Sequence, residues 1–88
     1  MTYTYLIMST GVDVSYDEKG RLSILNKLSK PIKLTNMEEQ NQVVETTGRC
    51  WIISQKLCSY KLEVDDDTFI FNYYPGNKTW KMETATFT

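Results

Sequence analysis

The chain has 88 residues, of which 41% are hydrophobic, a net charge of −1 at pH 7 and no histidine. This length allows a single domain, residues 1–88, and the small charge gives no overall attraction to nucleic acid or to an anionic membrane. Without imidazole, Ser-His-Asp and Cys-His nucleophile pairs and almost all transition-metal sites are excluded, so we expect no cofactor, and an enzyme would have to rely on carboxylates.

The first third of the chain predicts a series of short strands. Over 2–8 the side chains alternate between two sets that are both substantially apolar, and over 12–16 apolar side chains alternate with polar ones, so both segments are predicted strands. Residues 17–20 form a predicted turn in which Gly20 can take a positive φ, and 21–25 return as the second arm of a hairpin. Pro31 limits the next strand to 32–34 at most.

The one helix candidate is the segment 36–45. Thr35 and Glu38 have the spacing of a capping box, which favours a helix start. The apolar residues that follow make a poor 3.6-residue stripe, so such a helix would be short and weakly packed. A loop that leads into a strand at 42–46 explains the same residues, and the sequence leaves both interpretations open.

The second half is rich in aromatic and β-branched residues. The clearest amphipathic strand is 58–64, the segment 69–74 runs back after a turn, and 79–87 closes the series. Between the last two, Tyr74-Pro75-Gly76-Asn77 has proline and glycine where a type II turn needs them. The sequence therefore predicts a mainly β fold of about 6–8 short strands, as a small antiparallel sandwich, barrel or highly curved sheet.

Apolar side chains on both faces of two predicted strands indicate a partner-binding surface. In a sheet with one buried face, the second apolar set of 69–74 and of the N-terminal strand has no packing role. The predicted partner-binding residues are Tyr74, Trp80, Ile70, Tyr3 and Tyr5. The alternative is that another part of this chain covers them.

The strongest cationic element is formed by Lys27, Lys30 and Lys33, spaced by three around Pro31. In an extended conformation these lysines would project along one edge and contact phosphates or an acidic partner. Lysine offers charge without the bidentate recognition of arginine, so nucleic acid would be held by its backbone. The alternative is a solvated linker.

Carboxylates and thiols provide only weak metal candidates. Asp65, Asp66 and Asp67 are a weak candidate for a Ca²⁺ or Mg²⁺ site, but they lack the spacing of a calcium-binding loop, and a solvated hairpin turn explains them equally. Cys50 and Cys58 are too few for a tetrahedral zinc site. The sequence does not decide whether these two cysteines pair.

The segment 46–51, Thr-Thr-Gly-Arg-Cys-Trp, resembles the T-T-G-x-x-W part of the loop that chagasin-type cysteine-protease inhibitors insert into an active-site cleft. These inhibitors are β-sandwiches, and the resemblance implies inhibition by loop insertion. It covers six of the 88 residues, and Val44-Glu45 stand where Asn-Pro usually precedes the element. In the alternative, Gly48 turns the chain and Trp51 enters the core.

These features predict a non-catalytic binding protein of inhibitor or adaptor type that covers a surface of a macromolecule, most readily a protein. No apolar run is long enough to span a membrane, and residues with A/T-rich codons are common, as in many bacteria and phages. We therefore expect a cytoplasmic protein, phage-encoded and directed at a host enzyme or defence factor. The alternatives are a small-barrel nucleic-acid-binding protein that uses the lysine edge and a structural subunit of a homomeric or virion assembly, with a carboxylate-only enzyme last.

Overall fold

The computed structural model describes residues 2–7, 11–40, 43–46 and 48–86, and all regular structure in these ranges is β. It consists of nine strands, slightly more than expected: β1 (Tyr3–Ile7), β2 (Val12–Asp17), β3 (Leu22–Asn26), β4 (Ile32–Asn36), β5 (Val43–Thr46), β6 (Gly48–Ile52), β7 (Cys58–Val64), β8 (Asp67–Tyr74) and β9 (Thr79–Thr86). The prediction of a mainly β fold is confirmed.

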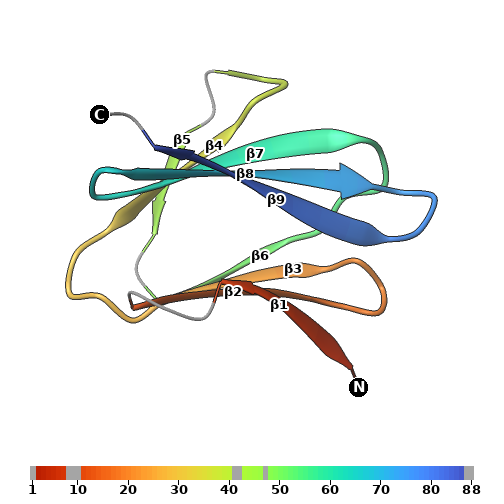
Figure 1. Cartoon of the computed structure of the whole chain (residues 1–88), viewed down its shortest axis with the longest axis horizontal. Coiled ribbons are helices and arrows are strands. Elements are labelled where there is room, and N and C mark those ends of the chain that lie inside the picture. The colour runs from red at the N-terminus through yellow and green to blue at the C-terminus, as the bar shows by residue number, and fades with distance from the viewer. Residues whose placement is uncertain (1, 8–10, 41–42, 47, 87–88) are drawn as a thin grey trace.

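The strands form two antiparallel sheets that face each other as a sandwich (Figure 1). The four-stranded sheet has the order β1-β2-β3-β6, and the five-stranded sheet has the order β5-β4-β7-β8-β9. The sheets do not close into a barrel, so β1, β6, β5 and β9 are edge strands. The chain passes from one sheet to the other after β3, β5 and β6.

The segment 36–45 contains no helix in its described residues. Asn36 ends β4, and its Oδ1 accepts hydrogen bonds from Glu38 N at 3.0 Å and Glu39 N at 3.4 Å. Gln40 N donates to Asn36 O at 2.9 Å, and Val43 begins β5. The Asn36 side chain and backbone thus stabilise a turn, with the same local bonds that asparagine forms at the start of a helix. The helix candidate is wrong, and the strand alternative holds over 43–46.

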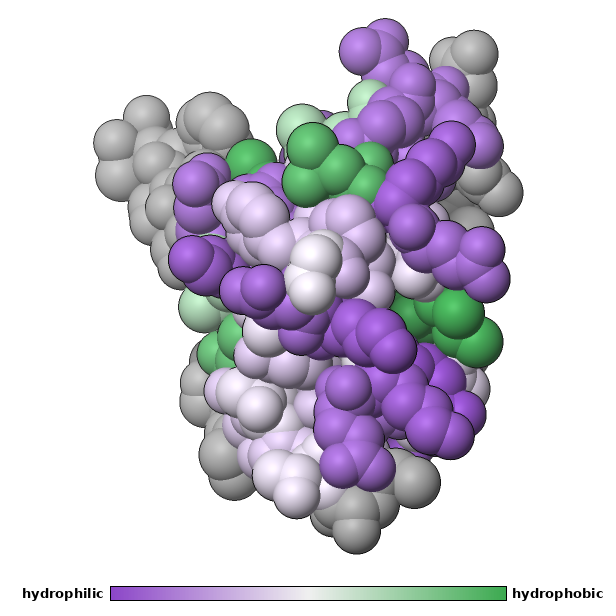
Figure 2. Space-filling model, turned by 90° about the vertical axis from the view of Figure 1, so that its right-hand side faces the viewer, coloured by the Kyte–Doolittle hydropathy of each residue, from purple (hydrophilic) through white to green (hydrophobic). Residues whose placement is uncertain are grey.

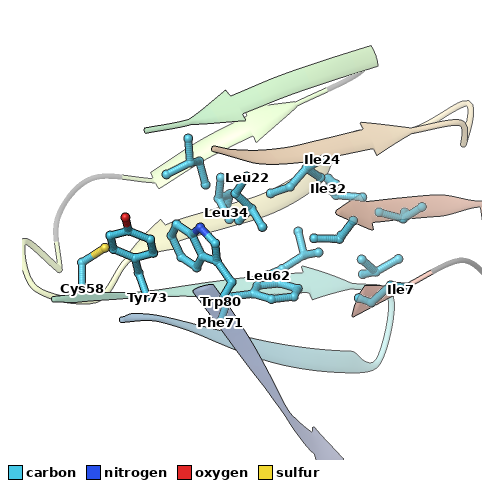
Figure 3. Close-up of a cluster of buried hydrophobic side chains, with 14 residues drawn as sticks. Ile7, Leu22, Ile24, Ile32, Leu34, Cys58, Leu62, Phe71, Tyr73 and Trp80 are labelled. Atoms are coloured by element: carbon cyan, nitrogen blue, oxygen red, sulfur yellow. The ribbon is translucent and has the colours of Figure 1, made fainter. Parts of the chain in front are cut away.

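The core lies between the sheets and follows the strand alternation. In β7, Leu62 and Val64 are buried while Lys61 and Glu63 lie on the outer face, which confirms the predicted amphipathic strand. Figure 3 shows the buried side chains converging from both sheets. They are Ile7, Val12, Val14, Leu22, Ile24, Ile32, Leu34, Ile52, Cys58, Leu62, Val64, Phe71, Tyr73 and Trp80.

Trp80, predicted at a partner-binding surface, is a core residue and only 2% exposed. Its Nε1–H donates to Gly20 O at 2.7 Å, and its ring centroid lies 4.9 Å from that of Tyr73 (Figure 3). The cause of the error is the hairpin register: β8 and β9 pair Tyr73 with Trp80, so both side chains point inward. Trp80 thereby fixes the β2–β3 turn of one sheet to the other sheet.

The turn between β8 and β9 differs from the predicted type II turn. That type requires a positive φ at its third residue, Gly76, whereas the residue with positive φ in this loop is Lys78, at 55°. Asn77 N donates to Tyr74 O at 3.3 Å, and Tyr74 pairs with Thr79 across four loop residues. A two-residue turn would pair Trp80 with Phe71, which is also a core residue, so Trp80 faces inward with either loop length.

The β2–β3 turn forms as predicted, with Gly20 at a φ of 82°. Asp17 is 1% exposed, and its carboxylate accepts hydrogen bonds from Lys19 N, Arg21 N and Arg21 Nε at 3.0, 3.0 and 3.1 Å. Burial by itself would raise the pKa of Asp17, but these hydrogen bonds and the guanidinium charge outweigh it, so the pKa is lowered.

Candidate functional site

The structure does not gather the predicted partner-binding residues into one surface. Tyr74 is exposed and Ile70 half-buried on the outer face of the five-stranded sheet, where Lys81 Nζ lies 5.3 Å from the Tyr74 ring centroid. Tyr3 and Tyr5 are exposed on β1, in the other sheet. With Trp80 in the core, the patch predicted around Tyr74 loses its second aromatic ring.

The three predicted lysines do not form an unopposed cationic edge. Lys27 Nζ lies 3.0 Å from Asp13 Oδ2, and Lys30 forms an ion pair with Asp65. Lys33 on β4 pairs in register with Glu63 on β7, so a carboxylate-bearing residue neighbours it as well. The expected positive edge is therefore corrected to a row of locally compensated charges.

The acidic triplet is the hairpin between β7 and β8. Val64 pairs with Asp67, which leaves Asp65 and Asp66 as the loop, and Asp65 has a φ of 54°. Asp65 contacts Lys30, as described above. Within the described ranges, no three histidine, cysteine or acidic side chains are grouped so that they could hold a metal ion. The triplet therefore fits a solvated turn.

Three exposed large apolar side chains lie in a short segment that begins in β6, and two of them, Ile53 and Leu57, are the most exposed of this kind among the described residues. Trp51 is 43% exposed, Ile53 72% and Leu57 65%. The alternative interpretation of 46–51 places Trp51 in the core, but its pairing with Ser23 directs its side chain to the outer face of the four-stranded sheet. We call Trp51, Ile53 and Leu57 the β6 surface. The sequence signal for it is Cys50–Ile53, a run that is apolar on both faces, as in 69–74.

A cleft opens between the two sheets directly beside β6. It has a volume of about 250 Å³ and is lined by Leu34, Asn36, Cys50, Trp51, Ile52, Ile53 and Tyr60. A larger and more polar depression of about 630 Å³ adjoins it and shares Asn36, Ile53 and Tyr60. Trp51 and Ile53 of the β6 surface thus line a hollow with walls from both sheets, and Leu57 follows them in the same segment.

The polar groups in and beside the cleft are already engaged with one another. Asn36 Nδ2 donates to Tyr60 Oη at 3.3 Å, and Cys58 Sγ donates to Ser54 Oγ at 3.2 Å. Cys50 and Cys58 are free thiols, on β6 and β7 of different sheets. The side chains that line the cleft are mainly apolar, and its Asn36 and Tyr60 are bonded to each other.

Burial keeps the titratable groups of the cleft uncharged. Desolvation raises the pKa of the Cys50 thiol, and it is also the main cause that raises the pKa values of Cys58 and Tyr60. The thiolate is the nucleophilic form of cysteine, so a raised pKa makes both thiols poor nucleophiles at neutral pH. This arrangement favours binding over covalent chemistry.

The outer side of β6 carries positive charge. The guanidinium carbons of Arg21 and Arg49 lie 4.8 Å and 5.4 Å from the Trp51 ring centroid, within the range of cation–π contacts. Arg21 is also paired with Asp17. Arg49 forms no ion pair with any residue that the structure describes, so its charge is open to a partner.

A smaller hollow of about 190 Å³ lies on the outer face of the four-stranded sheet. Its lining residues are Tyr3, Tyr5, Asp13, Ser15, Ser23, Leu25 and Arg49. In register, Tyr5 and Trp51 stand on the two edge strands with Ser15 and Ser23 between them, so aromatic rings flank a floor of small side chains.

The hydropathy of the surface is mixed. In Figure 2, which shows the side near the N-terminus, hydrophobic atoms form small separate patches among hydrophilic and near-neutral side chains. Partner contact on such a surface would rest on individual side chains rather than on one large aliphatic area. No helix in the described ranges has the length and apolar character to cross a membrane.

The segment that resembles the chagasin-type loop is built differently here. Gly48 starts β6 with a φ of 84°, and Trp51 lies within that strand, while Thr47 is outside the described residues. Residues 48–51 of this segment therefore lie in an edge strand and not at the tip of a loop that could insert into a cleft. Comparison of the chain with protein-family models, with curated proteins and with solved structures gives no match.

Proposed function

We propose that this chain is a non-catalytic binding protein, of inhibitor or adaptor type, that covers a surface of a protein partner. The observation that carries the proposal is the β6 surface: Trp51, Ile53 and Leu57 are exposed within one short segment, and Trp51 and Ile53 also line the cleft between the sheets. Three such side chains on a small domain are costly to keep in water unless a partner covers them. The abundance of residues with A/T-rich codons supports a phage or bacterial origin, and with it a host enzyme or defence factor as the proposed partner.

The energetics of the β6 surface suit a binding site. Burial of a fully exposed Ile or Leu side chain is worth roughly 1.5–3 kcal/mol. Tryptophan and arginine are the residue types most enriched among binding hot spots, and here Arg49 lies against Trp51. A partner that covers these residues would gain enough free energy for a specific complex without any catalytic group.

A capture experiment with matched variants tests the proposal. The wild-type chain, Ile53→Ser/Leu57→Ser and the control Tyr74→Ser would each be immobilised and exposed to bacterial lysate, with bound proteins quantified by mass spectrometry. We expect at least one prey to be retained by wild type and Tyr74→Ser but reduced about tenfold or more by the double variant. Equal recovery of every prey by the double variant would contradict the proposal.

A second candidate function is binding of single-stranded nucleic acid on the outer face of the four-stranded sheet. The observation in its favour is that Tyr3, Tyr5 and Trp51 lie on this face together with two arginines. Lys27 and Lys30 are paired with carboxylates, and this weakens the alternative in which nucleic acid binds along the lysine edge. A gel-shift titration with labelled oligonucleotide at about 50 mM salt tests it, since such contacts are strongest at low salt. No shift for the wild-type chain would end this candidate.

A further inference from the structure

We propose that β6 captures an extended segment of the partner by strand addition, with alternate side chains of that segment entering the inter-sheet cleft. This inference rests on the proposed function and specifies the binding mode and the chemistry of the bound segment. Strand addition uses backbone hydrogen bonds for affinity and side-chain pockets for selectivity. Both requirements are met at the same edge of this sandwich.

The first requirement is an unpaired strand edge. Among the described strands β6 pairs only with β3, so its other edge presents unpaired backbone N–H and C=O groups. Proline and charged side chains are the residues that usually block pairing at an edge strand. β6 contains no proline, and Arg49 is its one charged residue. The strand is therefore able to accept another chain along its free side.

The second requirement is a pocket on the correct side of that edge. Cys50 pairs with Ile24 and Ile52 with Leu22, so both point toward the interior. The cleft that they line is bounded on the opposite wall by Leu34 and Tyr60 of the five-stranded sheet. A strand added to β6 would continue the four-stranded sheet and direct every second side chain into this cleft.

The chemistry of the two sides defines the segment. The cleft is lined mainly by apolar side chains, and its Asn36 and Tyr60 are bonded to each other, so inward positions should be aliphatic. On the outer side, Arg49 has no acidic partner among the described residues, and cross-strand neighbours of opposite charge stabilise a pair of strands. The expected occupant is an extended peptide that alternates aliphatic and acidic residues.

The open edges β1 and β9 lack this combination: none of the hollows described above is lined by β9, and the one beside β1 differs from the cleft at β6. The hollow beside β1 lies on the outer face of its sheet, not between the sheets. Its floor contains Ser15 and Ser23, which offer no apolar pocket. The structure therefore favours β6 as the site of strand addition.

The test uses the synthetic peptide acetyl-EIEIEIE-amide with a fluorescent label, the same peptide N-methylated at alternate residues, and acetyl-KIKIKIK-amide. We expect fluorescence polarisation to show binding of the acidic peptide and about tenfold or greater weakening by N-methylation, because methyl groups block the backbone bonds. Arg49→Glu should reverse the preference between the acidic and basic peptides. Equal binding of the methylated and unmethylated peptides would overturn the proposal.

Two further measurements separate this inference from the proposed function. Cys50→Phe fills the cleft but leaves Ile53 and Leu57 in place, and it should weaken the peptide and the captured prey about tenfold or more. Full prey binding by a folded Cys50→Phe variant would overturn strand addition while the proposed function stands. Should that variant misfold, alkylation of Cys50 in the wild-type chain at about pH 8.5 replaces it: saturating peptide should slow the reaction, and an unchanged rate would overturn the proposal.

Discussion

At the scale of single residues, the structure depends on a few polar side chains whose partners the sequence does not reveal. Asp17 is buried at the end of β2, and it satisfies two backbone N–H groups of the turn and the Arg21 side chain. The sequence marks the turn through Gly20, but it does not show that the carboxylate is enclosed. Local spacing predicts a turn, whereas burial depends on the opposite sheet.

Replacement of Asp17 should destabilise the domain. We expect Asp17→Ala to lower the free energy of unfolding by about 1–3 kcal/mol, because the turn loses its acceptors. Asp17→Asn should cost less, since the amide oxygen can still accept from the backbone. Urea denaturation at neutral pH measures both. A change below about 0.5 kcal/mol for Asp17→Ala would mean that water replaces the carboxylate at no cost.

The same residue gives the stability a pH dependence. The pKa of Asp17 in the folded chain lies below its reference value of 3.8. Its contribution is therefore fully present above that reference value and is lost as the pH falls through the lower, folded-state pKa. We expect wild type to lose stability more steeply than Asp17→Asn as the pH is lowered below 3.8, measured by urea midpoints. Parallel curves would contradict this assignment.

At the scale of elements, the register of one hairpin decides which tryptophan is buried. The four-residue loop after Tyr74 pairs Tyr73 with Trp80 and turns both inward. The pairing of Ser23 with Trp51 turns the other tryptophan outward. Strand alternation can be predicted from the sequence, and it succeeds in β7. The face of each tryptophan does not follow from the sequence, because it depends on the pairing register and on which sheet a strand joins.

The contact between the Trp80 indole and the β2–β3 turn should be a measurable link between the sheets. Trp80→Phe keeps an aromatic ring but removes the hydrogen bond to Gly20 O, so we expect a loss of about 1–3 kcal/mol in the free energy of unfolding. Tyr74→Phe, on the exposed outer face, is the matched control and should change it by less than about 0.5 kcal/mol. Equal effects of the two substitutions would refute the link.

Gly20 should tolerate no side chain. Its φ is 82°, and an added Cβ would lie 2.8 Å from Tyr73 Oη. We expect Gly20→Ala to destabilise the domain by about 1 kcal/mol or more, because backbone strain and crowding add. Gly76→Ala is the control, since no positive φ is needed there and the space is open. Thermal unfolding of both variants checks the difference.

At the scale of the whole molecule, the open side of the sandwich is the basis of the proposed function. The mainly β antiparallel architecture follows from strand alternation and turn residues. The cleft beside β6 does not, because it is formed by residues from β4, β6 and β7 that only the arrangement of the two sheets brings together. A sequence pattern indicates which strands have two apolar faces, but not which of them lies at an edge.

The β6 surface should matter for binding but not for folding. Ile53 and Leu57 are mostly exposed, so their replacement by serine removes little buried apolar area. We expect Ile53→Ser/Leu57→Ser to change the free energy of unfolding by less than about 0.5 kcal/mol per site, as measured by urea denaturation. A larger loss would show that these side chains serve the fold of the isolated chain.

The most direct measurement is amide hydrogen exchange of the wild-type chain, alone and in complex with the captured partner. We expect the partner to slow exchange in β6, Gly48–Ile52, and in residues 53–57, with little change at Ile70 and Tyr74 on the far sheet. Slower exchange confined to the outer face of the five-stranded sheet, with β6 unaffected, would contradict the account.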